Sequence, residues 1–256
     1  MKFIAKILLD FLSFFLKKSD DAVYYLVKHS LKNEIKKANI TAFAHDHIEN
    51  AIEIAKNSKN TEGVILDVGG GIASTAAIFD NSFPKNKIYI FEPLKINFRE
   101  IEKQKKANWI LVNKAVGSEV TSTYMNVSNY LTASSLLEMN SENESYREQL
   151  QLKEKELISV TTLDAEIPEN TPVLILKMDV QGFELEVLKG ATKTLKNTKV
   201  IVLEINNHDG YKGSPTYFEI DDFLRNKNFE LYDLLASNRV KNKLQDWDAI
   251  YVNKNL

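Results

Sequence analysis

Apolar and polar positions along the chain predict strands that alternate with helices from about residue 62 onward. Short apolar runs at 64–68 and 88–91 are typical of buried strands, because each has only four or five residues and is almost uninterrupted. Segment 96–105 instead places its apolar residues at helical spacing. Since alternating strands and helices are typical of a parallel sheet covered by helices, the pattern predicts an α/β fold.

The second half of the chain repeats the alternation and ends differently. Segments 173–180 and 200–205 are strand-like, and a helix is predicted after each of them. Two further strand-like segments, 229–235 and 247–252, close the chain as a pair. We therefore expect a mostly parallel sheet with one reversed edge strand.

Residues 121–170 interrupt the alternation. They hold two strand-like runs, 123–127 and 157–160, separated by a Ser/Asn-rich stretch and a charged run. This pattern predicts an inserted hairpin that could act as a lid over a site, with a solvated loop as the alternative for the charged run. The predicted organisation is a helical N-terminal segment at 1–60 and one domain at 61–256 that carries the insertion.

The first 18 residues predict an amphipathic helix. From Phe3 to Phe15 apolar residues recur every three or four positions, and polar residues fall on the opposite face. Lys6 and Asp10 interrupt the apolar run and no small-residue cleavage site follows, so neither a secretion signal nor a membrane span is predicted. We expect the helix to pack on the protein or on a second copy in a homo-oligomer, with weak membrane-surface contact as the alternative.

The composition limits the classes of function. Lysine and arginine total 33 and aspartate and glutamate total 35, a formal net charge of −2, so no broad basic surface for nucleic acid is predicted. The chain has no cysteine, which excludes disulfides, thiolate nucleophiles and thiolate zinc ligands. We expect a cytoplasmic protein, with a peripheral position at the inner face of the membrane as the alternative.

A glycine-rich turn follows the first strand of the alternation. Asp67 lies at the end of the strand, and Gly69, Gly70 and Gly71 follow it. A dinucleotide fingerprint needs a third glycine where this chain has Ser74, and a triphosphate loop needs a Gly-Lys pair that is missing here. The pattern that remains resembles the S-adenosylmethionine loop of class I methyltransferases.

The turn and the next strand end suit such a cofactor chemically. Glycines lack a Cβ and let the backbone approach an amino-acid moiety, while the Asp67 carboxylate can accept from its ammonium group, directly or through water. Glu92 ends the next strand, where a carboxylate can accept two hydrogen bonds from ribose hydroxyls. Alone, Glu92 would be a helix-capping acid before Pro93. Together with the turn, it predicts a cofactor site.

A series of motifs along residues 63–205 resembles the FkbM-type methyltransferase family. The motifs occur in the order which that family shows: Asp67-Val-Gly, Phe91-Glu-Pro, Lys114-Ala-Val-Gly, Ser134-Ser, Thr162-Leu-Asp, Leu176-Lys-Met-Asp-Val-Gln-Gly, Val187-Leu-Lys-Gly-Ala and Glu204. The long motif that starts at Leu176 is specific.

The resemblance implies a Rossmann-like class I methyltransferase fold, a three-layer sandwich, with S-adenosylmethionine as cofactor. It implies O-methylation of a hydroxyl-bearing sugar, glycan or natural-product acceptor. It also places Pro93 and Ala115 among the cofactor-binding positions. The chain departs from the family's usual Gly-Ala-Asn-any-Gly, because Gly70 and Gly71 replace the alanine and the asparagine and Ala73 replaces the last glycine. The loop stays small but lacks a side-chain donor.

Candidate catalytic residues follow the strands of the second half. Methyl transfer to oxygen needs in-line positioning and removal of a proton. Lys177 and Asp179 lie two apart at the carboxyl edge of one strand, where open α/β sheets place ligands. The resemblance gives both residues catalytic or substrate-orienting roles and places Asp179 beside the cofactor, with a structural ion pair as the alternative.

The loop after the next strand supplies a further candidate. His208 has a usual pKa suited to a general base, although a loop histidine is also a common surface residue. No metal is predicted as the first choice, but Asp179, Glu204 and His208 could together hold a hard cation, which is the alternative.

Two other classes of function stay open. A binding module could keep the cofactor fold without catalysis, which the altered glycine turn favours slightly. A nicotinamide-dependent oxidoreductase is the second alternative, and the missing third glycine argues against it.

Overall fold

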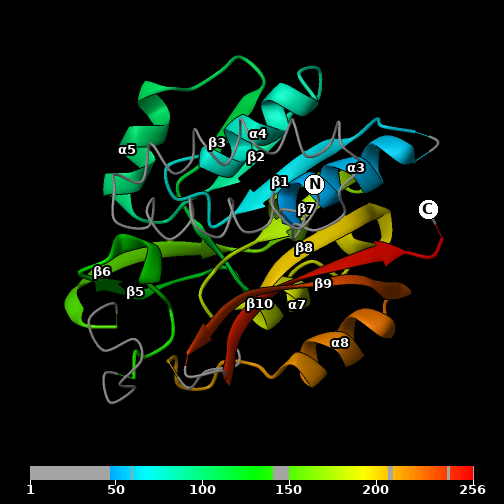
Figure 1. The fold of residues 1–256 in the computed structure, drawn as a ribbon. Helices are drawn as coiled ribbons and strands as arrows, with labels where there is room; N and C mark the ends of the chain where they lie inside the picture. The colour runs from blue at the N-terminus through cyan, green and yellow to red at the C-terminus, as the bar shows by residue number, and fades with distance from the viewer. Residues whose placement is uncertain (1–46, 59, 141–149, 207–209, 241–242, 256) are drawn as a thin grey trace, which may run out of the picture. The chain divides into compact units, whose positions relative to one another are not determined.

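The computed structural model describes residues 47–58, 60–140, 150–206, 210–240 and 243–255 (Figure 1). The predicted N-terminal amphipathic helix, residues 141–149 of the predicted charged run and His208 lie outside these ranges, whereas the end of that run, 152–156, is strand. Within them, no helix combines the length and the apolar character needed to cross a bilayer.

A seven-stranded sheet forms the centre of the described fold (Figure 1). Its strands are β1 (Val64–Val68), β2 (Ile88–Phe91), β3 (Trp109–Val112), β7 (Val173–Met178), β8 (Thr198–Asn206), β9 (Phe229–Val240) and β10 (Lys243–Asn253). They lie in the order β3-β2-β1-β7-β8-β10-β9, and the first five are parallel. The carboxyl ends of these parallel strands therefore meet at one edge of the sheet.

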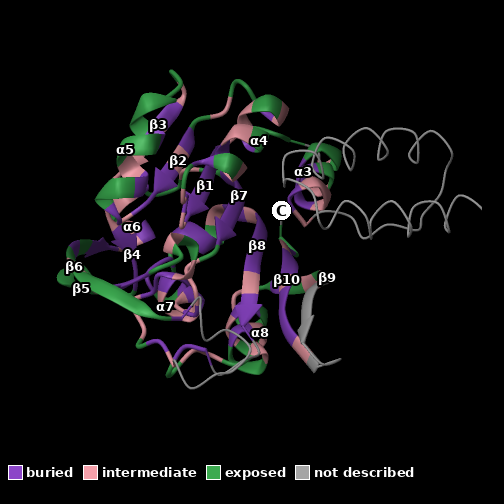
Figure 2. Ribbon diagram, turned by 60° about the vertical axis from the view of Figure 1, so that its left-hand side comes forward, coloured by how far each residue is buried: buried purple, intermediate pink, exposed green. Residues whose placement is uncertain are grey.

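Helices cover both faces of this sheet. One face carries α3 (His47–Asn57), α4 (Ser74–Ser82) and α5 (Lys95–Lys103), and the other carries α7 (Glu184–Lys189) and α8 (Tyr217–Arg225). Within β1, Ile65 belongs to the apolar cluster that holds Phe79 of α4, whereas its neighbour Leu66 belongs to the cluster that holds Leu188 of α7. Successive strand residues point to opposite faces, so β1 is buried on both (Figure 2). This is the helix-covered sheet that the alternation predicts and the three-layer sandwich that the resemblance implies.

The single reversed strand lies one place in from the edge. β10 runs antiparallel to β8 and to β9, so β9 forms the edge and points the same way as the parallel strands. A reversed strand is present as predicted, but not at the edge position that the sequence analysis gave it. The physical reason is burial: Ala249, Ile250 and Tyr251 of β10 are fully buried, whereas Tyr232 and Leu234 of β9 are exposed.

Two strands of the predicted insertion and a short strand that precedes it build a second, three-stranded sheet. It consists of β4 (Ala115–Val116), β5 (Thr121–Ser128) and β6 (Leu152–Thr161), and β5 and β6 pair antiparallel. A short 3₁₀ turn, η1 (Leu131–Ala133), follows β5, and α6 (Leu163–Glu166) follows β6; a second 3₁₀ turn, η2 (Thr194–Asn197), precedes β8. The Ser135 hydroxyl donates to the Gln181 carbonyl at 2.8 Å, which ties the segment after η1 to the end of β7.

Candidate active site

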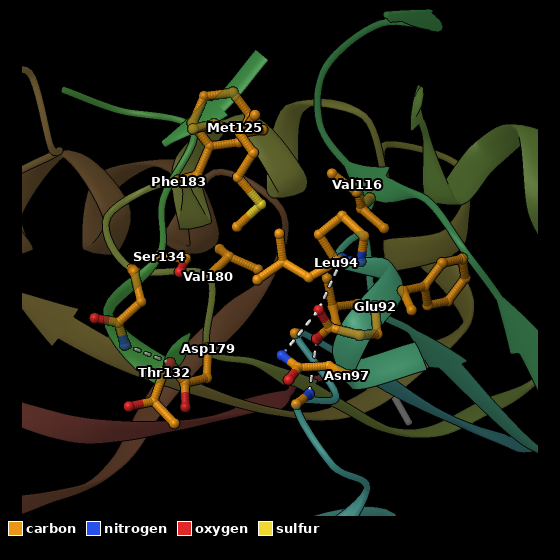
Figure 3. A pocket seen from close by; sticks show the side chains of 18 of the residues that line it. Glu92, Leu94, Asn97, Val116, Met125, Thr132, Ser134, Asp179, Val180 and Phe183 are labelled. Atoms are coloured by element: carbon orange, nitrogen blue, oxygen red, sulfur yellow. Dashed lines mark hydrogen bonds between the residues drawn. The ribbon is translucent and has the colours of Figure 1, made fainter. Parts of the chain in front are cut away.

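A cavity of about 690 Å³ opens at the carboxyl ends of β1, β2 and β7 (Figure 3). Leu94, Met125 and Phe183 give it apolar walls. In Figure 3, Glu92 lies on one side of this cavity and Asp179 on the other. A concave site with apolar walls and a few polar groups is typical of small-molecule sites.

Two glycines of the turn are required by their geometry. Gly69 has φ 76°, and a Cβ there would lie 1.9 Å from the carbonyl oxygen of Asp179. Gly71 has φ 56°, and nothing lies within 4 Å of the position its Cβ would take. Gly70 does not line the cavity, and its N–H donates to the Phe91 carbonyl at 3.0 Å. The turn therefore packs tightly against β7 at Gly69 and leaves free space at Gly71.

Glu92 is the buried acid of the cavity. Its Oε2 accepts from the Gly71 N–H at 2.9 Å, and its Oε1 accepts from the Leu94 N–H at 3.0 Å and from Asn97 Nδ2 at 3.3 Å. Burial raises the pKa of Glu92 to about 7, although these hydrogen bonds oppose the rise. A carboxylate offers about four acceptor positions, so roughly one remains for a ligand. Accepting from two ribose hydroxyls would require exchange of one protein bond.

Asp67 and Lys177 form a buried ion pair behind the turn. Lys177 Nζ lies 3.2 Å from Asp67 Oδ1 and 4.0 Å from Asp179 Oδ2, and it donates to the Gly69 carbonyl at 3.0 Å. Burial favours the neutral form of Lys177, but Asp67 and Asp179 outweigh it and raise the pKa of Lys177. Lys177 therefore holds the turn and the end of its own strand together through these contacts, and its catalytic role stays a prediction.

Gln181 joins two carboxyl groups at the end of β7. Its Nε2 donates to Asp179 Oδ1 at 2.7 Å and to Glu204 Oε2 at 3.0 Å, and the Tyr211 hydroxyl lies 2.8 Å from its Oε1. Its backbone is left-handed, with φ 55°, which is uncommon for a residue other than glycine. Because the amide uses both N–H groups and its oxygen in this network, the orientation of the side chain is fixed.

Glu204 lies half-buried at the far side of this network. Burial, together with the nearby carboxylates of Asp179 and Glu184, raises the pKa of Glu204 well above its usual range. In the part of the chain that the structure describes, no three His, Cys, Asp or Glu side chains are arranged to hold a metal ion. The metal alternative also used His208, which lies outside that part, and it stays a prediction.

The structure brings most of the predicted site residues to one place. Those that line the cavity are Gly69, Gly71, Glu92, Pro93, Ala115 and Asp179. Those that do not line it are Asp67, Gly70 and Lys177, which contribute through the turn and the ion pair.

Several residues of the site were not singled out in the sequence. Asn97 sits on α5 and donates to Glu92, and Thr132 of η1 lines the cavity. Gln181 lies inside the specific motif that begins at Leu176, so its position in that motif was a signal. Thr132 and Tyr211 come from irregular segments without periodicity, and no local pattern could have found them.

Residues 32–231 match the family model described as the methyltransferase FkbM domain. No curated protein gives a significant match.

Solved structures resemble the fold at low identity. The crystal structure of methyltransferase FkbM from Methylobacillus flagellatus KT is 14% identical, with a TM-score of 0.50, and the match covers 75% of this chain and 43% of that one. This chain thus spans less than half the length of that protein. This similarity confirms the predicted fold class.

Two further structures also match. Magnesium protoporphyrin IX methyltransferase from Synechocystis PCC 6803, solved with bound SAM, is 13% identical, with coverage of 81% and 78% and a TM-score of 0.43. Precorrin-6y C5,15-methyltransferase from Geobacter metallireducens GS-15 is 14% identical, with coverage of 80% and 86% and a TM-score of 0.43.

Proposed function

The chain belongs to the FkbM methyltransferase family, as its motifs predict, and we propose that it transfers a methyl group from S-adenosylmethionine to a hydroxyl group of a sugar, glycan or natural-product acceptor. The observation that carries the proposal is the cavity between Glu92 and Asp179. It is lined by a buried carboxyl group that can accept from ribose hydroxyls, on Glu92, and by an accessible carboxylate, on Asp179.

The residues of the cavity fit this cofactor. Because Gly71 has no side chain, the space next to its backbone is open. Glu92 keeps one acceptor position, and Leu94, Val116 and Met125 offer apolar surface suited to an adenine ring. When bound, the cofactor supplies an electrophilic methyl group on a sulfonium.

The protein's part in the reaction is to position the acceptor and to take its proton. Asp179 is the accessible carboxylate of the cavity, with 45% of its side chain exposed. Gln181 and Lys177 contact the two oxygens of Asp179 from different sides and fix its direction. Asp179 is the base that we favour, because an ionised carboxylate held in place can accept the hydroxyl proton as the new bond to carbon forms. His208 stays a second candidate.

Isothermal titration with S-adenosylmethionine tests the cofactor, and release of S-adenosylhomocysteine with a panel of glycans, nucleotide sugars and natural products tests turnover. We expect saturable binding and acceptor-dependent product. Asp179→Asn should abolish most turnover, while Asp222→Asn, an exposed carboxylate on α8, serves as the matched control.

Three results would contradict the proposal. Absence of binding would refute the cofactor, and binding without turnover on any acceptor would favour a noncatalytic module. Saturable binding of a reduced nicotinamide cofactor in its place would favour an oxidoreductase.

A further inference from the structure

A second cavity, of about 730 Å³, adjoins the first one at the end of β7. Thr132, Asp179 and Gln181 line both cavities, so these residues form a shared wall. A group bound in the second cavity would therefore meet the Asp179 carboxylate from the side away from Glu92. This is the relation that an acceptor must have to a methyl donor bound in the first cavity.

The second cavity offers mainly hydroxyl and amide groups. Tyr130, Asn206 and Tyr211 line it in addition to the shared wall, and its apolar lining consists of Ala133 and Leu150. Hydroxyls and amides can both donate and accept, which matches the mixed donors and acceptors of a polyol.

The titratable side chains that line the second cavity, among the described residues, are all acidic. The carboxyl groups of Asp179, Glu204 and Asp246 line it, and no lysine or arginine does so among the described residues. Lys177 pairs with Asp67 behind Asp179 and does not line the second cavity. An anionic acceptor would lie beside these acids with no lysine or arginine of the described lining to pair with, which is unfavourable at low dielectric.

Tyr130 gives the cavity an exposed aromatic ring. Its side chain lies at the rim with the residue 51% exposed, and its backbone N–H donates to the Ser128 hydroxyl at 3.1 Å, which fixes the chain at that point. Exposed aromatic rings with a polar end are suited to contact a ligand that has both apolar C–H faces and hydroxyl groups. A sugar ring is a ligand of this kind.

We propose that the second cavity is the acceptor subsite, that it takes a neutral polyhydroxylated ring and rejects one that carries a carboxylate or phosphate, and that Tyr130 is its recognition residue. This inference rests on the proposed function, since it names the substrate class of the same site. The reacting hydroxyl faces Asp179, and any charged remainder of a larger acceptor stays outside the cavity.

The test uses matched probes on the full chain in the presence of saturating S-adenosylhomocysteine. The probes are methyl hexosides of several configurations and, for each, the corresponding uronic acid and 6-phosphate, with binding measured by saturation-transfer NMR. We expect at least one neutral hexoside to bind, with its anionic counterparts weaker by about a hundredfold. Binding of the anionic probes at equal or greater strength, or of no neutral probe, would overturn the proposal.

A variant pair separates recognition from folding. Tyr130→Ala should weaken the neutral probe about tenfold or more, while Tyr124→Ala, a tyrosine of similar exposure on β5 that lines neither cavity, should leave it unchanged. Equal effects of the two variants would contradict the role of Tyr130.

The same samples are titrated with S-adenosylmethionine. Failure to bind it would refute the proposed function, whereas normal cofactor binding with a preference for anionic probes would refute only the acceptor inference.

Discussion

Replacement of Glu92 by glutamine is expected to change the pH dependence of stability in a calculable way. The pKa of Glu92 is raised from its usual 4.5 to about 7 in the folded protein. Between these values the folded chain keeps a proton that the unfolded chain has released, so the free energy of unfolding falls as pH rises. Because one pKa unit corresponds to about 1.4 kcal/mol, the full effect is about 3 kcal/mol.

The glutamine variant removes this titration and adds a cost that does not depend on pH. A glutamine has only one acceptor oxygen, so either the Gly71 N–H or the Leu94 N–H loses its partner, at about 1–3 kcal/mol. Urea denaturation from about pH 5 to about pH 8.5 should therefore show the variant gaining about 2–3 kcal/mol relative to the native protein across that range. Parallel pH profiles for the two proteins would refute the reasoning.

The cofactor gives the same variant a second, independent readout. Loss of a charge-assisted acceptor should weaken S-adenosylmethionine binding by about tenfold to a hundredfold. Glu184→Gln is the matched control, because burial also raises the pKa of Glu184 to about 7 and this residue does not line the cavity. It should reproduce the pH trend in stability and keep cofactor affinity within about threefold.

Three further predictions concern the same site. Asp179→Asn should lower kcat by about 10²- to 10⁴-fold in a methyl-transfer assay, with the Kd for S-adenosylmethionine changed far less; an equal loss in both would argue against its role as base. Lys177→Met should lower the free energy of unfolding by about 3–5 kcal/mol, because Asp67 is left buried and unpaired, and urea denaturation should show that adding Asp67→Asn restores much of this; an additive double variant would contradict the ion pair. Gly69→Ala should destabilise the fold more than Gly71→Ala in the same assay, since only the former Cβ meets backbone at 1.9 Å, whereas equal losses would show that φ alone decides.

Local patterns predicted the elements well because each of them depends on nearby residues. The apolar run of β1 and the helical spacing of α5 appear within a few residues of their observed bounds. The glycine turn was also readable, since an acid, a strand end and closely spaced glycines are neighbours in the chain. The family follows from the same motifs, and the match over residues 32–231 confirms it.

The pairing of segments that are distant in the chain was harder to predict from the sequence. The sequence predicts a closing pair of strands, yet only burial on both faces of β10 decides that it lies inside β9. Their spacing at the strand end makes Lys177 and Asp179 equal candidates for the site, and only the fold shows that their surroundings differ. The former is buried against Asp67 and the latter is accessible beside the cavity.

By itself, the sequence determined the α/β fold, the family and the end of the sheet where the chemistry lies, because strand ends and turns are written in consecutive residues. Only the tertiary structure decided which groups meet there. Gln181 hydrogen-bonds to both Asp179 and Glu204, and the Tyr211 hydroxyl contacts it as well. This network unites segments that are far apart in the chain. Their contact depends on how the layers pack, and packing leaves no periodic signal in the residues that it brings together.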